Sequence, residues 1–183
     1  MTDKPITKLV EGYRRMTERL AERLQGIEQV TQEALHEMLD GVRNESVSLK
    51  ELTKTEAQQV ADWLKRDFYA LAEEARKTGQ EFKEWFPFEV KVEESYLWDK
   101  IMSAADPTIV DLLELKEEAM LADVELWHTG EVTAPGILEC TRCGERLHFS
   151  AAGHIPPCPK CHNTTFARVT VGGGDTPDPL PSE

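Results

Sequence analysis

Four cysteines form two matched pairs in the last third of the 183-residue chain. They are Cys140, Cys143, Cys158 and Cys161, with two residues inside each pair and 14 residues between the pairs. A Cys-x-x-Cys turn points backbone amides at its sulfurs, and two such turns that face each other offer four thiolates. Zinc accepts this tetrahedral sulfur coordination without a redox change. The spacing therefore predicts one structural zinc site whose metal ligands are these four cysteines.

The residues after each pair suit the tight turn that such a site requires. Gly144 follows the first pair, where a left-handed backbone conformation is often needed. His162 and Asn163 stand at the same place after the second pair, instead of the usual glycine. Because both residue types tolerate a positive φ better than most, the second turn is expected to form as well.

Two other interpretations of the cysteines compete with zinc. One is reduced cysteines without a metal, but chance rarely gives two matched pairs with no cysteine left over. The other is iron in a rubredoxin-like electron carrier, and such sites generally have a longer insert between their pairs. Zinc is therefore favoured over iron.

The start of the chain lacks an apolar signal core, so we expect the protein in the reducing cytosol, with its cysteines free of disulfides.

The charge of the chain limits the classes of partner. Asp and Glu outnumber Lys and Arg by 34 to 21, which gives a formal net charge of −13. Such a chain repels polyanions, so nucleic acid is not the expected partner. The segment from His128 to Val171 is nearly neutral and leaves room for only a weak local contact. No stretch of 18 apolar residues exists, so no membrane span is expected.

Helical periodicity dominates the chain before the cysteines. Apolar residues recur at steps of three and four from Ile6 to Arg43, which predicts one long amphipathic helix with a single apolar stripe. Thr53 and Glu56 form a capping-box pattern at the start of a second helix. The linker from Asn44 to Leu52 is short, so these two helices are expected to form an antiparallel hairpin.

Two further helical segments are expected before the cysteines. Pro87 ends or bends the second helix because proline cannot continue it. A third helix is predicted from Val92 to Ala104. A fourth begins at Asp106-Pro107, an N-cap followed by proline at the first helical position, and extends past Trp127. These segments complete a helical hairpin or bundle over residues 1–128.

Beyond this bundle, Gly, Pro, Thr and cysteine replace the helix-forming pattern. Three short strands are predicted around the cysteines, at Gly136–Glu139, Arg146–Phe149 and Thr165–Val169. So small a core depends on its metal to fold. The expected fold is therefore mainly α, with a small β zinc ribbon of rubredoxin-like knuckles at residues 129–171. The proline-containing tail, residues 172–183, is expected to be disordered.

The chain resembles a known family in three stretches. They are Glu51–Glu56 in the helical hairpin, His128–Val132 at the entry to the ribbon, and Pro157–Cys161 followed by Phe166. The family is that of the bacterial zinc ribbon-containing proteins of unknown function, the YbeL-like family, and the likeness runs from about Tyr13 to Arg168. The resemblance implies that the four cysteines are metal ligands, and it implies no particular activity.

A helical bundle ahead of a four-cysteine module is also typical of rubrerythrin-type di-iron proteins, which place Glu-x-x-His pairs inside the bundle. The chain has two such pairs, Glu33-x-x-His36 and Glu125-x-x-His128. His36 lies roughly 100° around its helix from Leu35, which marks the inner face. His128 is expected at a helix end. Both histidines are therefore expected at the surface, without a di-iron site.

The remaining patterns bear on activity. No glycine-rich phosphate loop, Ser-His-Asp order or His-Glu-x-x-His helix is present. A zinc ion held by four thiolates has no open coordination position and cannot activate water. We therefore expect a non-enzymatic protein-interaction module whose partner is protein, and which could form a homo-oligomer through its helices. The alternative is a redox protein, with a rubredoxin- or rubrerythrin-like iron site or a zinc switch that oxidants release.

Overall fold

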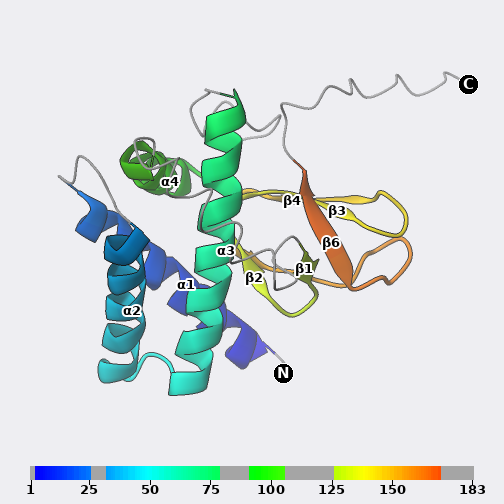
Figure 1. The fold of residues 1–183 in the computed structure, drawn as a ribbon. Coiled ribbons are helices and arrows are strands. Elements are labelled where there is room, and N and C mark those ends of the chain that lie inside the picture. Colours follow the sequence, from blue (N-terminus) through cyan, green and yellow to red (C-terminus); the bar gives the residue numbers. More distant parts are fainter. Residues whose placement is uncertain (1–2, 26–31, 79–90, 106–125, 170–183) are drawn as a thin grey trace, which may run out of the picture.

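The computed structural model of the chain describes residues 3–25, 32–78, 91–105 and 126–169. These residues form four helices followed by a small antiparallel β region that carries the cysteines (Figure 1). The helices are α1 (Asp3–Leu24), α2 (Gln32–Ser48), α3 (Lys54–Thr78) and α4 (Val92–Ala105). The predicted fold class, mainly α with a C-terminal β ribbon, is confirmed.

The prediction of one long helix from Ile6 to Arg43 is wrong. The helix α1 ends at Leu24, α2 begins at Gln32, and the two helices pack against each other. A continuous helix would carry its apolar stripe away from the rest of the chain. Because the segment is divided, both halves bury their apolar residues in one core with α3. Residues 26–31 between the helices lie outside the described part.

The start of α3 is the capping box that the sequence predicts. The backbone N–H of Thr53 donates to Glu56 Oε2 at 2.7 Å, and the N–H of Glu56 donates to Thr53 Oγ1 at 3.3 Å. Lys8 Nζ on α1 also lies 2.5 Å from Glu56 Oε2, so the same carboxylate joins α1 to the start of α3. The predicted packing of this helix against the preceding one is confirmed by the contacts between α2 and α3.

The third predicted helix is confirmed by α4, and the fourth is only partly tested. Residues 106–125 and the segment around Pro87 lie outside the described part. The prediction that Trp127 lies near the end of a helix is wrong, because Trp127–His128 forms strand β1. Trp127 pairs with Phe166 in an antiparallel register, so the sheet of the ribbon begins before the cysteines.

The ribbon consists of two antiparallel sheets. The larger one has the strand order β1-β6-β3-β4, and the smaller one pairs β2 with β5. The three longest strands of the ribbon all belong to the larger sheet. They are β3 (Gly136–Cys140), β4 (Arg146–Phe149) and β6 (Thr165–Val169), which confirms the three predicted strands. The short strands β2 (Val132–Thr133) and β5 (Gly153–His154) were not predicted. The tail at residues 172–183 lies outside the described part.

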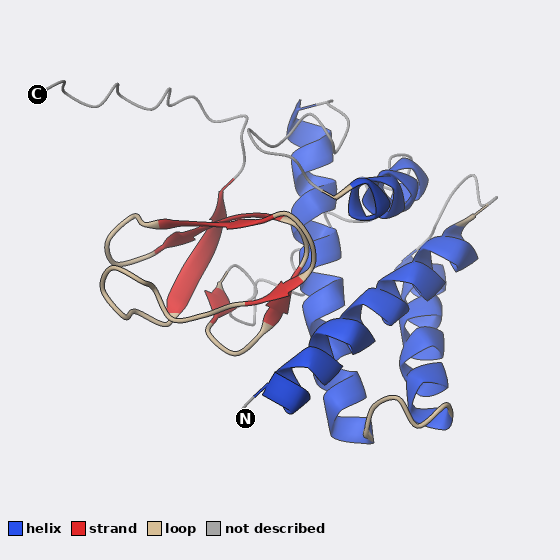
Figure 2. Cartoon of the chain, turned by 180° about the vertical axis from the view of Figure 1, so that it is seen from behind, coloured by secondary structure: helices blue, strands red, loops and turns tan. Residues whose placement is uncertain are grey.

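The ribbon and the helices share an interface. Val132 and Ala134, which come from the ribbon, belong to the buried cluster of the helices. A second cluster lies inside the ribbon and contains Trp127, Leu138, Cys140, Ile155, Cys158 and Phe166. Figure 2 shows the strands beside α3, and contacts of β2 with both α1 and α3 place the ribbon against these two helices.

A buried carboxylate lies at this interface. Asp67 on α3 is fully buried and accepts hydrogen bonds from Tyr13 Oη at 2.7 Å, Trp127 Nε1 at 2.7 Å and the backbone N–H of Ala134 at 2.6 Å. Burial raises the pKa of Tyr13 well above its usual value, and the charge of Asp67 acts in the same direction. Tyr13 therefore stays protonated and keeps its role as donor.

The described helices also bear on the expectation of no membrane span. None of the helices in the described ranges combines the length and the apolar composition that a bilayer crossing requires.

We predict that Glu56→Ala lowers the free energy of unfolding by about 1 kcal/mol at neutral pH, because a capping interaction is lost. The hydrogen bond from Lys8, together with the N–H of Thr53, lowers the pKa of Glu56 from 4.5 to about 2. The stabilisation is therefore present above about pH 4.5 and is lost as the pH falls through about 2. Urea unfolding, followed by the circular dichroism of the helices, measures the difference in unfolding free energy between the variant and wild type. It is measured at two pH values, neutral pH and a pH below about 2. Gln59→Ala, an exposed change in the same helix, is the control. An equal difference at both pH values would contradict the prediction.

Candidate metal centre

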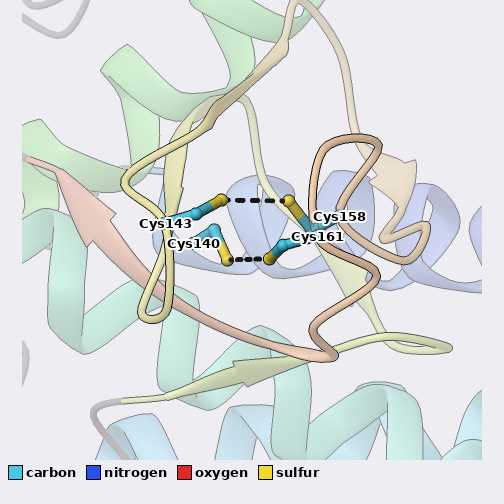
Figure 3. A group of neighbouring side chains, drawn as sticks. All are labelled: Cys140, Cys143, Cys158 and Cys161. Carbon is cyan, nitrogen blue, oxygen red and sulfur yellow. Dashed lines mark hydrogen bonds between the residues drawn. The ribbon is translucent and has the colours of Figure 1, made fainter.

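Two loops of the ribbon bring the four cysteines together. Cys140 is the last residue of β3, and Cys143 follows in the turn that leads to β4. Cys158 and Cys161 lie in the loop between β5 and β6. Figure 3 shows the pairs facing each other with their sulfurs directed into the space between the loops. The side chains that the sequence predicts as metal ligands thus converge on one point.

The sulfur positions fit one tetrahedral metal ion. Cys140 Sγ lies 3.5 Å from Cys161 Sγ, Cys143 Sγ lies 3.6 Å from Cys158 Sγ, and all four sulfurs lie within 4.8 Å of one another. Metal–sulfur bonds of about 2.3 Å in a tetrahedron require sulfurs about 3.8 Å apart. A disulfide requires about 2.05 Å, so the four thiols are free. The geometry therefore suits coordination of a single ion by all four sulfurs.

The two loops have the same backbone design. In the first loop, the N–H of Cys140 donates to the carbonyl of Glu145, and the N–H of Gly144 donates to the carbonyl of Cys140. In the second loop, the N–H of Cys158 donates to the backbone carbonyl of Asn163, and the N–H of His162 donates to the backbone carbonyl of Cys158. Each pair of bonds closes a tight turn around the first cysteine. The two loops are therefore equivalent knuckles, as the sequence spacing predicts.

The residue after each pair adopts the left-handed conformation that the sequence predicts. Gly144 has a φ of 72°, and His162 has a φ of 58°. A Cβ atom at Gly144 would meet nothing within 4 Å, so the conformation, not crowding, favours glycine there. The prediction that histidine could occupy the equivalent position in the second knuckle is confirmed.

Asn163 has a role that the sequence pattern did not reveal. Its Nδ2 lies 3.5 Å from Cys140 Sγ, 3.1 Å from Thr141 Oγ1 and 2.8 Å from the carbonyl of Thr165. The side chain of one knuckle thereby contacts a sulfur of the other. From the sequence, Asn163 stood out only as a residue that tolerates a positive φ. Its position directly after the second pair was the available signal, but the contact depends on how the knuckles face each other.

The two thiols of the first knuckle, Cys140 and Cys143, differ in pKa. Burial raises the pKa of Cys140, but the N–H groups of Arg142 and Cys143 outweigh this effect and bring it to about 6. For Cys143, the N–H of Glu145 lowers the pKa, while burial and the neighbouring sulfurs raise it to about 12. Four negative sulfurs in so small a space repel one another. The cluster therefore holds four thiolates only when a cation neutralises them, and metal binding releases protons.

The histidines that a di-iron site would need are not assembled. His36 is half-buried on α2 rather than at the surface as expected, and Glu33 is exposed. His128 lies exposed in β1, and Glu125 is outside the described residues. Over the described ranges, the four cysteines are the only His, Cys, Asp or Glu group close enough to hold a metal ion.

Comparisons with known proteins agree with this site. The sequence profile of the family described as "zinc-ribbon containing domain" matches residues 22–170. "Uncharacterized protein YbeL" of Escherichia coli strain K12 is 26% identical over 163 residues, which cover 89% of this chain and 97% of that protein. The proteins of the same name in Escherichia coli O6:H1 and O157:H7 match to the same extent. No solved structure matches the chain significantly. The resemblance to the YbeL-like family is thus confirmed.

We predict that Asn163→Ala lowers metal affinity about 10- to 100-fold, because residues that orient metal ligands typically contribute this much. The change removes the amide from Cys140 Sγ and leaves all four ligands in place. Competition with a chromophoric chelator measures the affinity. Thr164→Ala, an exposed change at the next position, is the matched control. Equal affinities of the two variants would assign Asn163 no role in the site.

Proposed function

The chain belongs to the zinc-ribbon containing domain family, and we propose that its four cysteines hold one structural Zn²⁺ that shapes a protein-docking surface. The observation that carries the proposal is the convergence of four sulfurs within 4.8 Å of one another at the base of two equivalent knuckles. Their side chains face inward, and other side chains of the same loops remain exposed. The metal then sets the shape of the loops, and the exposed side chains make contact with the partner.

A closed donor set supports a structural role for the ion rather than a catalytic one. Four thiolates complete a tetrahedron and leave no position for water or substrate. The same donors also accept iron, which would make the site a redox centre. Zinc has no redox chemistry and is the ion that a Cys₄ ribbon most commonly holds. A non-enzymatic zinc protein is therefore the function that we propose.

The exposed tips of the knuckles form the proposed docking surface. We call this surface the knuckle tips; it consists of Arg142, Pro159, Lys160 and His162, which are all exposed. In Figure 1, the loops that carry them lie at the end of the ribbon away from the helices. A partner could therefore contact these residues without displacing the helical region.

The charge of the knuckle tips suggests the class of partner. Arg142 and Lys160 occupy the same position in their Cys-x-x-Cys turns, so each knuckle presents one cation. Within the described residues, Arg142 has no ion-pair partner, and Lys160 Nζ lies 4.0 Å from a carboxylate oxygen of Glu145. The whole chain carries a net charge of −13, which repels a nucleic acid at long range. We therefore propose an acidic segment of a protein as the partner.

Three arginines on the surface of α1 are neutralised within the chain. Arg15 and Arg19 of α1 both pair with Glu51, at 2.9 Å and 2.8 Å, and Arg23 pairs with Glu45 at 2.6 Å. This surface is therefore less suited than the knuckle tips to attract an acidic partner. Association of two copies through the helices stays a prediction, which light scattering after size exclusion would test.

For the metal, we predict a colourless protein that contains one zinc ion per chain. Elemental analysis and an absorption spectrum of protein purified without added metal measure this, and loss of zinc from a Cys140→Ser variant is the control. A red protein with visible thiolate-to-iron absorption would contradict the proposal and favour the redox alternative. Release of zinc by mild peroxide, with restored binding after reduction, would favour an oxidant-sensitive switch.

For the docking surface, we predict that Arg142→Glu combined with Lys160→Glu abolishes partner capture and leaves zinc content unchanged. Capture from a cell extract, quantified against wild type, measures this loss. The matched control is Lys50→Glu combined with Lys54→Glu, which changes the net charge equally at exposed positions of the helical region. Equal losses in both double variants would show a general charge effect and remove the knuckle tips from recognition.

A further inference from the structure

One row of side chains crosses the sheet from the metal site to the helices. Cys140 in β3 pairs with Phe166 in β6, and Phe166 pairs with Trp127 in β1. Residues that face each other in adjacent antiparallel strands project on the same side of the sheet. All three are buried in the same cluster, which also contains Cys158. The position of Trp127 thus depends on the strands that carry the cysteines.

Trp127 connects this row to the buried carboxylate of α3. Its Nε1 donates to Asp67 Oδ1 at 2.7 Å, and the backbone N–H of Ala134 donates to Asp67 Oδ2 at 2.6 Å. Tyr13 of α1 supplies the third hydrogen bond, at 2.7 Å. Two of these three donors therefore come from the ribbon and one comes from the helices.

Two arginines complete the contact. The guanidinium carbons of Arg66 and Arg168 lie 4.8 Å and 5.3 Å from the centre of the Trp127 ring. Arg66 of α3 pairs with Glu131 and also donates to the carbonyl of Val132 at 3.3 Å. One arginine of the helices and one of the ribbon thus contact the same indole ring, and burial strengthens these interactions.

Arg168 belongs to the ribbon and is held in place by it. Its guanidinium donates to the carbonyl of Pro135 at 2.9 Å and to Thr133 Oγ1 at 2.8 Å, and it lies 3.9 Å from Asp67 Oδ1. Gly136 leaves room for it, because a Cβ there would lie 2.1 Å from its Nη1. The charge that faces Asp67 from β6 therefore depends on the folded ribbon.

The ribbon also closes the apolar core of the helices. Val132 and Ala134 are fully buried in the helical cluster, and Ala152 packs against it. The contacts of β2 and β5 with α1 place these residues over the side of the bundle that carries Tyr13. Without the ribbon, this part of the core and the carboxylate of Asp67 would face solvent.

We propose that zinc binding at the four cysteines stabilises the helical region through Asp67, so that the ribbon is a metal-dependent cover of the helical core. The proposal rests on the proposed zinc site. Without the ion, the few apolar residues of the ribbon cannot hold its strands together. Trp127, Ala134 and Arg168 then withdraw from Asp67. Among its described donors, Asp67 keeps only Tyr13 and the neighbouring Arg66, whose Nε lies 3.4 Å from Oδ1. The apolar core that the ribbon covered is then exposed, and the hydrogen bonds that fixed Asp67 are lost, so the packing of α1 against α3 weakens.

Thermodynamic linkage gives this proposal a sharp consequence. If zinc stabilises the contact at Asp67, then the contact must raise the affinity for zinc by the same factor. A change at Asp67 on a helix should therefore weaken a metal site built entirely from ribbon residues. An independently folding ribbon would show no such effect.

The first test is the zinc affinity of Asp67→Asn, measured by chelator competition on the full chain. The amide cannot accept all the hydrogen bonds that the carboxylate accepts, so we expect affinity to fall about 5- to 150-fold, the usual range of coupling between sites. Asp62→Asn, an exposed change on the same helix, is the matched control and should keep wild-type affinity. Unchanged affinity in a folded Asp67→Asn protein would overturn the proposal.

The second test remains decisive if Asp67→Asn does not fold. Trp127→Phe keeps an aromatic ring in the ribbon core and removes the donor to Asp67. We expect reduced zinc affinity and, on chelation of wild type, faster hydrogen exchange of α1 and α3 amides near Tyr13 and Asp67. Val47→Ala, which alters the packing of α2 against the helical core, is the control.

The outcomes separate the coupling from the zinc site itself. A wild-type protein that binds no zinc would contradict the proposed function. A protein that binds zinc but shows unchanged helical exchange on chelation, and unchanged affinity in Trp127→Phe, would leave the zinc site intact and overturn the coupling alone.

Discussion

The carboxylate of Asp67 carries a negative charge into the interior of the protein, and the elements around it must compensate for that charge. A buried charge is tolerated only when hydrogen bonds and opposite charges replace the water that it has lost. Here the donors come from α1, β1 and the chain after β2, and Arg168 of β6 brings a positive charge within 3.9 Å. The relative placement of helices and ribbon is therefore set by directional contacts as well as by apolar packing.

The metal centre obeys a second, more local constraint. Two knuckles with the same backbone hydrogen bonds present four sulfurs to one point. The pKa of Cys140 lies below that of Cys143 because the two sulfurs meet different N–H groups and neighbours. This design concentrates negative charge that a cation must balance. Arg168 lies on β6, which follows the second knuckle, and Trp127 lies on β1, which pairs with β6. The two charged centres of the molecule therefore share one small sheet.

Several features could be predicted because their signals are local. The capping box at Thr53 and Glu56, the three strands around the cysteines and the left-handed residue after each knuckle all depend on neighbouring residues. The prediction of one helix from Ile6 to Arg43 failed because a helical pattern continues across a break when both halves bury the same kind of residue. Trp127 was placed in a helix for a similar reason: the strand that it forms is only two residues long and depends on β6.

The sequence by itself determined the set of four candidate sulfur ligands, because the spacing within a knuckle is a property of a few adjacent residues. The tertiary structure alone decided most of what surrounds Asp67, since three of its hydrogen-bond donors lie 54, 60 and 67 positions away along the chain. It also decided that Asn163 contacts Cys140 of the opposite knuckle. Such contacts arise when distant segments meet, and no periodicity or motif records which segments those will be. Local chemistry thus defined the metal site, and long-range packing defined its connection to the helices.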